Sequence, residues 1–267
     1  MFEIVRYEGR RRARGTLALT VFVGVFALLI VGLFPSIEAA APGLEAYVES
    51  LPEAFRQGFG IEAIATIEGF LSTEFYQFVW LLLLGLYMAY AGGGAIAGDV
   101  ETGRLDLVLA TPVSRSRLIV ETYLSLVVPI VTLNAVTPLV VFGSTVAIDE
   151  SISFVDVLAV HLLSIPYLLV CASIGLVLSV LVQRADAAQR GGIAVVFLLF
   201  VVDSVTADTD FEWLGALSPT RYYDPTEILV DSSYDVEGHS CSSWPRSSCW
   251  HSAGASSEGR TSNVAVS

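Results

Sequence analysis

The feature that most limits how this chain can fold is a series of long apolar runs. One of them, residues 79–97, reads VWLLLLGLYMAYAGGGAIA. About 20 apolar residues in a helix cross the hydrocarbon core of a bilayer, and a helix satisfies its own backbone hydrogen bonds there. Charged residues make up only 15% of the chain, against about 25% in a typical soluble domain. The sequence therefore predicts an all-α, polytopic membrane protein.

Five apolar runs are long enough to be transmembrane helices. Their predicted bounds are 16–34, 75–97, 118–148, 157–182 and 191–206. The third run is longer than the roughly 20 residues that cross a bilayer, so its first turns are expected in the cytoplasmic membrane interface. The connecting segment 35–74 shows apolar residues at helical spacing, and either holds short amphipathic surface helices or is a solvated acidic loop.

The distribution of arginine predicts the orientation of these helices. Segments 1–15, 98–117 and 183–190 carry 10 Arg and 6 acidic residues. Segments 35–74, 149–156 and 207–238 carry 2 Arg and 18 acidic residues. Positively charged loops stay on the cytoplasmic side. We therefore expect a plasma-membrane protein with a cytoplasmic N-terminus.

The overall charge is acidic, and the basic residues are of one kind. The formal net charge is −13, and all 14 basic residues are Arg. This composition indicates a high-salt organism, in which acidic surfaces stay solvated, and it argues against interpreting the acidity as a cation site. The 3 Cys residues form no CxxC pair, so neither a disulfide framework nor a zinc site is expected.

The last segment, 239–267, differs in composition from the predicted transmembrane domain, 1–238. It contains 10 Ser in 29 residues and has no helical periodicity. In a reading frame that starts at the third base of each codon, TCN serine codons become codons for Val, Leu, Ile or Phe. We hypothesise that the tail is a frameshift product and that a sixth span has been lost. The alternative is a genuine disordered Ser-rich tail.

The segment between the second and third spans is longer than a turn requires. Residues 98–118 read GDVETGRLDLVLATPVSRSRL. Leu105, Val108 and Leu109 recur at helical spacing, with charges around them. Thr102-Gly103 marks a break before this short helix, which is expected to end before Pro112. The result is an amphipathic helix parallel to the membrane.

Two roles fit such a helix. It can dock into a groove on a partner protein, or it can lie in the lipid headgroups. A helix lying on lipid usually has a basic polar face, whereas this one carries one Arg and three acidic residues. This balance favours the protein partner. The expected docking residues are Asp99, Glu101, Gly103, Arg104, Leu105, Val108, Leu109, Pro112 and Arg115.

The N-terminal segment MFEIVRYEGRRRARG is also amphipathic. It predicts an interfacial helix that leads into the first span. Its arginines can hold anionic lipid at about 1 kcal/mol per charge, or can flank the same partner; the lipid interpretation is favoured. These arginines are Arg6, Arg10, Arg11, Arg12 and Arg14.

An interfacial helix, a span, a connecting segment and a second span are followed by a segment of the form E-x-G-x-L-x-x-(V/L)-L-x-x-P-V-S-R. This order resembles that of the ABC-2 type permeases, the membrane subunits of ATP-binding-cassette exporters. The residues that fit this form begin at Glu101 and end at Arg115. The resemblance covers residues 1 to about 237. The family normally has six spans, which supports the frameshift hypothesis.

The resemblance implies a mechanical function. The segment 98–118 would be a coupling helix that docks on a separate ATPase subunit, because this chain has no G-x-x-x-x-G-K-S/T phosphate loop. Two permease subunits, in a homo- or heterodimer, and two ATPases would form the transporter, with ATP and Mg on the ATPases. No cofactor on this chain, no enzymatic activity and no nucleic-acid partner are expected.

Several residues inside the spans have a predicted packing role. A run of small residues allows close helix packing, either within one subunit, which is favoured, or between subunits; it consists of Gly92, Gly93, Gly94, Ala95, Ala97 and Gly98. Pro129, Pro138 and Pro166 should kink their helices. Asn134 is expected to bond a freed carbonyl or a neighbouring helix.

Three further residues in the spans have side chains that can take part in chemistry. His161 is expected to be a satisfied packing residue, Cys171 a buried small apolar side chain, and Asp203 a carboxylate that reaches water at the end of the fifth span. Catalytic or metal-binding residues are not predicted, so an intramembrane enzyme is disfavoured. The alternative to a permease is a membrane scaffold that docks a partner without transport. The substrate cannot be read from the sequence.

Overall fold

The computed structural model describes residues 3–49, 66–105, 114–182, 184–206, 209 and 211–232. The chain divides into two units, 1–236 and 237–267. All described residues belong to the first unit. The tail 239–267, and with it the hypothesis of a lost sixth span, lies outside the described residues.

The described residues form helices and no strand, which confirms the all-α prediction. In chain order the elements are α1 (Glu3–Glu49), α3 (Ile67–Leu71), η2 (Ser72–Leu84), α4 (Gly85–Gly93), α5 (Ala97–Glu101), α7 (Arg115–Ala147), α8 (Phe154–Leu181), α9 (Ala185–Thr206), η3 (Glu212–Leu217), η4 (Pro219–Tyr222) and α10 (Pro225–Leu229).

Five helical stretches of the described residues are long and apolar enough to cross a membrane, as predicted. They are Gly9–Ala39, Ile67–Glu101, Arg115–Ala147, Phe154–Leu181 and Ala185–Thr206. The first begins before residue 16 because no break separates the predicted interfacial helix from the first span. Both belong to α1, which also continues into the predicted connecting segment as far as Glu49.

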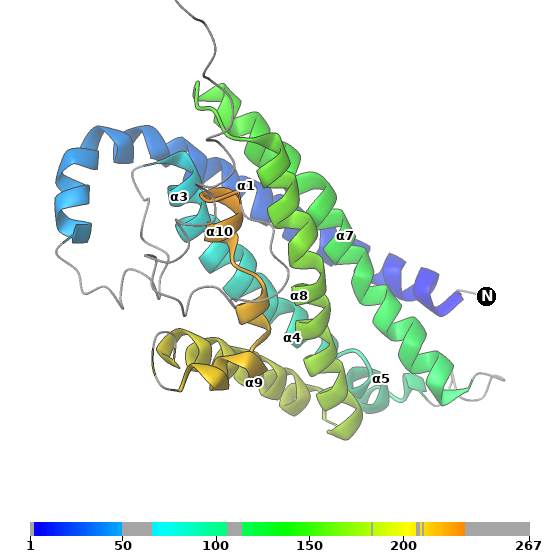
Figure 1. Cartoon of the computed structure of the whole chain (residues 1–267). Helices are drawn as coiled ribbons and strands as arrows, with labels where there is room; N and C mark the ends of the chain where they lie inside the picture. The colour runs from blue at the N-terminus through cyan, green and yellow to red at the C-terminus, as the bar shows by residue number, and fades with distance from the viewer. Residues whose placement is uncertain are drawn as a thin grey trace, which may run out of the picture. The chain divides into compact units, whose positions relative to one another are not determined.

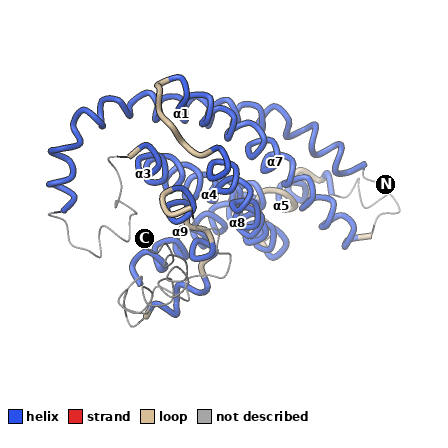
Figure 2. The backbone as a smooth tube through the Cα atoms, turned by 45° about the horizontal axis from the view of Figure 1, so that its top comes forward, coloured by secondary structure: helices blue, strands red, loops and turns tan. Residues whose placement is uncertain are grey.

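The spanning helices pack as a bundle in which the second span is central. α1 lies along α7, α7 packs on α8, and α4 contacts both α8 and α9 (Figures 1 and 2). In the most apolar window of the second span, 61% of the residues are buried, compared with 17% in α9. The second span therefore forms the core, and α9 offers most of its surface to its surroundings.

Polar residues at the helix starts explain where several elements begin. The Ser114 hydroxyl accepts a hydrogen bond from Arg117 N at 3.3 Å and caps α7. Ser153 caps α8 in the same way, and Asp224 caps α10 through Thr226 N at 2.7 Å. These side chains satisfy backbone donors that a helix leaves unpaired.

The second span changes its helical geometry within the bundle. Its middle part, η2, is a π-helix of 13 residues between α3 and α4. The wider turn places Tyr76 and Trp80 at buried positions facing α8. π-Helical turns are rare and frequently occur at functional sites.

Large apolar side chains remain exposed along the spanning helices. In α1 they include Leu17, Val21, Phe22, Val25, Leu28 and Leu33. In a soluble protein such a surface would cause aggregation, whereas hydrocarbon solvates it. This surface supports the assignment of α1 as a membrane-spanning helix.

The segment after α9 folds back against the bundle. α10 contacts α3, η2 and α8 (Figure 1), and its Ile228 and Leu229 are buried. Thr220 donates to Asp203 of α9, and Ser232 donates to Asp156 of α8 at 3.1 Å. Arg221 forms an ion pair with Glu212. Residues 211–232 are therefore fixed to the ends of two spans.

Candidate docking segment

The predicted break in the segment between the second and third spans is present. α5 ends at Glu101, and Gly103 has a φ of 66°, a left-handed conformation that favours glycine. The Thr102 hydroxyl donates to Gly98 O at 2.8 Å, which satisfies a carbonyl at the helix end. Helical backbone resumes at residues 104 and 105.

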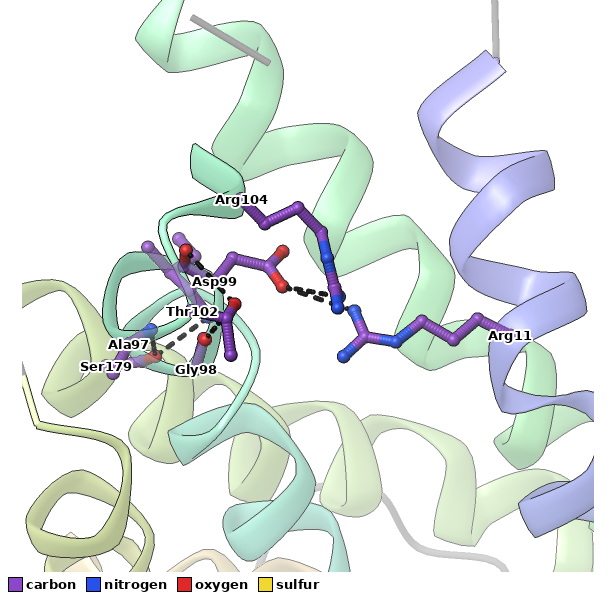
Figure 3. Close-up of polar contacts among 8 residues, drawn as sticks. Arg11, Ala97, Gly98, Asp99, Thr102, Arg104 and Ser179 are labelled. Atoms are coloured by element: carbon purple, nitrogen blue, oxygen red, sulfur yellow. Dashed lines mark hydrogen bonds and ion pairs between the residues drawn. The ribbon is translucent and has the colours of Figure 1, made fainter. Parts of the chain in front are cut away.

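Asp99 links α5 to α1 and to the start of the next helical turn. Its Oδ1 accepts from Arg104 Nη1 at 3.1 Å and from Arg11 Nη1 at 3.2 Å. Figure 3 shows both guanidinium groups pointing at this carboxylate, with Arg11 reaching across from α1. The Asp99 side chain is 19% exposed, so water and salt reach the pair and limit its strength.

Ser179 of α8 fixes the other side of α5. Its buried hydroxyl oxygen accepts hydrogen bonds from Ala97 N at 2.8 Å and Ile96 N at 3.0 Å (Figure 3). These are backbone donors at the start of α5 that have no partner within the helix. Ile96 is itself buried next to Leu176 of α8.

Glu101 ties α5 to α9. Its Oε1 accepts from the backbone N–H of Ala185 at 3.1 Å. Ala185 is the first residue of α9, where unpaired N–H groups and the helix dipole favour a negative charge. We define the polar junction as Arg11, Asp99, Glu101, Arg104 and Ser179 together with Ala185 N. It connects the docking segment to α1, α8 and α9.

Glycines bring the backbones beside this junction into contact. A Cβ at Gly93 of α4 would lie 2.8 Å from Ala188 O of α9, and one at Gly192 would lie 3.0 Å from Ala89 O. At Gly92 and Gly175 a Cβ would overlap the backbone of the facing helix. The prediction of close packing within one subunit is therefore confirmed for Gly92 and Gly93.

The other predicted docking residues are placed as follows. Leu105 is half-buried, and Arg115 is exposed at the first position of α7. Val108, Leu109 and Pro112 lie outside the described residues.

The predicted N-terminal arginines differ in their surroundings within the described part of the chain. Arg11 joins the polar junction, Arg10 and Arg14 are exposed, and Arg12 is half-buried. The side chain of Arg6 is not described. The lipid role of this group stays a prediction.

Sequence reasoning missed Ser179 and Glu121. Ser179 is an ordinary polar residue in an apolar helix, and no local pattern distinguishes it. Glu121 is buried in α7 and accepts from Arg117 Nε at 2.6 Å. Here a local signal existed, because Arg and Glu four residues apart face each other on a helix.

Predictions for residues inside the spans met different outcomes. Asn134 donates to Ile130 O at 2.8 Å and accepts from Ser164 of α8 at 3.2 Å, so it bonds both its own helix and a neighbour. Cys171 is buried, as expected. Asp203 is partly exposed but accepts a hydrogen bond from Thr220.

The prediction that His161 is a satisfied packing residue is wrong in part. The ring is fully buried against Trp80, and Nδ1 lies 2.7 Å from Val157 O. Nε2 has no hydrogen-bond partner among the described residues. The sequence could not reveal this, because the partners of a buried ring come from distant elements.

Metal-binding geometry is not found in the part of the chain that the structure describes, where no three His, Cys, Asp or Glu side chains are grouped. The polar junction is a structural link between helices. It joins separate helices through ion pairs and backbone caps.

Comparison with protein families gave one match. A family model described as "ABC-2 family transporter protein" matches residues 7–224. Comparison with curated proteins and with solved structures gave no match. Since the family model covers most of the chain, the chain belongs to the ABC-2 family of transporter proteins.

Proposed function

We propose that this ABC-2 family member is the permease subunit of an exporter in the plasma membrane, driven by ATP hydrolysed on a separate ATPase subunit. The segment from Asp99 to Arg115 would be the coupling helix that docks on that ATPase, on the cytoplasmic side. The observation that carries the proposal is the fastening of its first part, α5, to α1, α8 and α9 through the polar junction.

The polar junction makes mechanical coupling possible. A displaced loop moves the spans only if it is connected to them by contacts that persist during the movement. Glu101 holds the first turn of α9, Ser179 holds α5 on α8, and Asp99 holds it near α1. ATP binding would close an ATPase dimer, and the docked segments would carry this displacement into the helices of two permease subunits.

A coupling role divides the segment into two parts. The acidic residues Asp99 and Glu101 have partners within this chain, so we assign them to internal anchoring. The apolar residues Leu105, Val108 and Leu109 then supply the surface for the ATPase. A groove on the partner would accept such apolar side chains.

The test is co-purification with the ATP-binding subunit encoded beside the gene. The full-length chain should capture this subunit, and Leu105→Asp should reduce the amount captured at least tenfold, because an apolar contact is replaced by a charge. Leu217→Asp is the matched control. Leu217 is an exposed apolar residue in η3, on the predicted outer side, and its substitution should leave capture unchanged.

Glu101→Arg is unsuitable for this test because it would also remove the cap of α9. Capture that is equally strong with Leu105→Asp would contradict the docking assignment. Sequencing of the gene beyond codon 238 tests the tail. If the native chain captures nothing, the experiment is repeated with the sixth span restored, and a second failure would favour the scaffold alternative.

A further inference from the structure

A second polar region lies within the spanning bundle, away from the polar junction. The rings of Trp80 and His161 meet edge to face with centroids 4.6 Å apart, and those of Tyr76 and His161 are 5.4 Å apart. Tyr223, from the segment after α9, stacks on Tyr167 at 5.7 Å. We define the aromatic cluster as Tyr76, Trp80, His161 and Tyr223. All four side chains are buried.

Four polar atoms of the aromatic cluster lack a hydrogen-bond partner among the described residues. Among the described residues, Tyr76 Oη, Trp80 Nε1, His161 Nε2 and Tyr223 Oη accept or donate no hydrogen bond. Neighbouring Tyr167 shows the ordinary situation, since its hydroxyl donates to Leu81 O at 2.7 Å. Buried polar atoms in proteins nearly always have a partner, either protein or ordered water.

The four atoms have complementary hydrogen-bonding capacities. His161 Nδ1 lies 2.7 Å from the carbonyl oxygen of Val157 and must donate to it. In a neutral imidazole Nε2 is then an acceptor. The indole N–H of Trp80 is a donor only, and the two tyrosine hydroxyls both donate and accept. Water, which also donates and accepts, matches this set.

The surroundings of the aromatic cluster favour a neutral guest. The nearest acidic residue along α8 is Asp156, which accepts a hydrogen bond from Ser232. The acidic residue beside Tyr223 is Asp224, which accepts one from the first turn of α10. Burial, with the neighbouring Tyr76 and Asp224, raises the pKa of Tyr223 well above its ordinary value, so its hydroxyl keeps the proton. Because both carboxylates already accept these hydrogen bonds, an ion among the four buried rings would lose its hydration with little compensation.

We propose that the aromatic cluster binds ordered water inside the spanning bundle, between the π-helix η2, α8 and the segment that carries Tyr223. A bound water typically makes about three hydrogen bonds to otherwise unpaired buried groups. Water here links three elements that are distant in the sequence. This inference does not depend on the proposed function.

The first test is radiolytic footprinting of the full-length protein in detergent or nanodiscs. Hydroxyl radicals form from water in the beam and label side chains beside bound water. Tyr76, Trp80 and Tyr223 should be labelled although they are buried. Phe75 is the internal control, because it is equally buried and lies 5.0 Å from the Tyr76 ring but has no polar atom. Labelling of the three residues no faster than that of Phe75 would overturn the proposal.

The second test removes one hydroxyl and leaves the ring in place. If Tyr76 bonds water, Tyr76→Phe should lower the thermal unfolding midpoint, as Tyr167→Phe should by loss of the bond to Leu81 O. If the hydroxyl has no partner, the substitution removes a buried unsatisfied group and the midpoint stays or rises. That result would overturn the proposal.

The third test distinguishes bound water from a small organic molecule bound in the aromatic cluster. Radiolysis in ¹⁸O-labelled water should insert ¹⁸O into Tyr76 and Trp80 at the rate at which bound water exchanges. A small molecule retained through purification, found by mass spectrometry together with unlabelled Tyr76 and Trp80, would replace water as the ligand and overturn the proposal.

Discussion

The polar junction and the aromatic cluster are both polar regions built on the second span, yet they satisfy their polar groups in opposite ways. The junction uses charged side chains that are partly exposed and paired, such as Asp99 with Arg11. The cluster uses neutral side chains that are fully buried and carry polar atoms without a partner among the described residues, such as Trp80 Nε1 and His161 Nε2.

The difference follows from the access of water. At the junction, solvent reduces the cost of placing charges and also weakens their attraction, so charged pairs are tolerated there and each adds little stability. In the cluster a charge would be too costly, and neutral groups must be satisfied locally. The charged pairs therefore lie where solvent reaches them, and the neutral polar groups lie where it is excluded.

The largest expected effect comes from the glycine contacts that join α4 and α8 between the two regions. Gly175→Ala should destabilise the protein by about 1–3 kcal/mol or more, because its Cβ would overlap Ala89 O. Gly143→Ala is the matched control, since nothing lies within 4 Å of its Cβ, and alanine should be neutral or stabilising in a helix. Thermal unfolding in detergent measures both, and equal midpoints would contradict the packing.

A smaller effect is expected from Ser179→Ala in the polar junction. The change leaves Ile96 N and Ala97 N without their acceptor, at a cost of about 1–3 kcal/mol. Ser204→Ala should cost little, because that hydroxyl only bonds Phe200 O of its own helix. Hydrogen exchange at residues 96 and 97 measures the local effect; unchanged protection would exclude Ser179 as an anchor.

The smallest effect on stability is expected from Asp99→Asn. The pairs with Arg11 and Arg104 are partly exposed, so their loss should cost only about 0.2–1 kcal/mol at low salt and less at high salt. Unfolding midpoints at low and high salt measure this difference. Tyr76→Phe in the cluster should show no salt dependence. If salt changed the unfolding midpoints of both variants by the same amount, the contrast between a charged junction and a neutral cluster would be contradicted.

The sequence supported only part of the candidate site. It located the docking segment, its break at Thr102-Gly103 and its charged residues, because turn residues and helical periodicity are local signals. It treated Asp99 and Glu101 as part of a partner-facing surface. The structure gives these carboxylates partners 88 and 84 residues away in the chain, and no local pattern specifies such pairs.

By itself the sequence determined the class of the protein and the five spanning helices of its described part. The reason is that hydrocarbon accepts only segments that satisfy their own backbone, and apolar runs of the required length are visible in a single chain. Only the tertiary structure decided that the second span is central, that part of it is π-helical, and that His161 Nε2 has no hydrogen-bond partner among the described residues. These properties depend on which helices pack together, and the apolar runs are too similar to specify their neighbours.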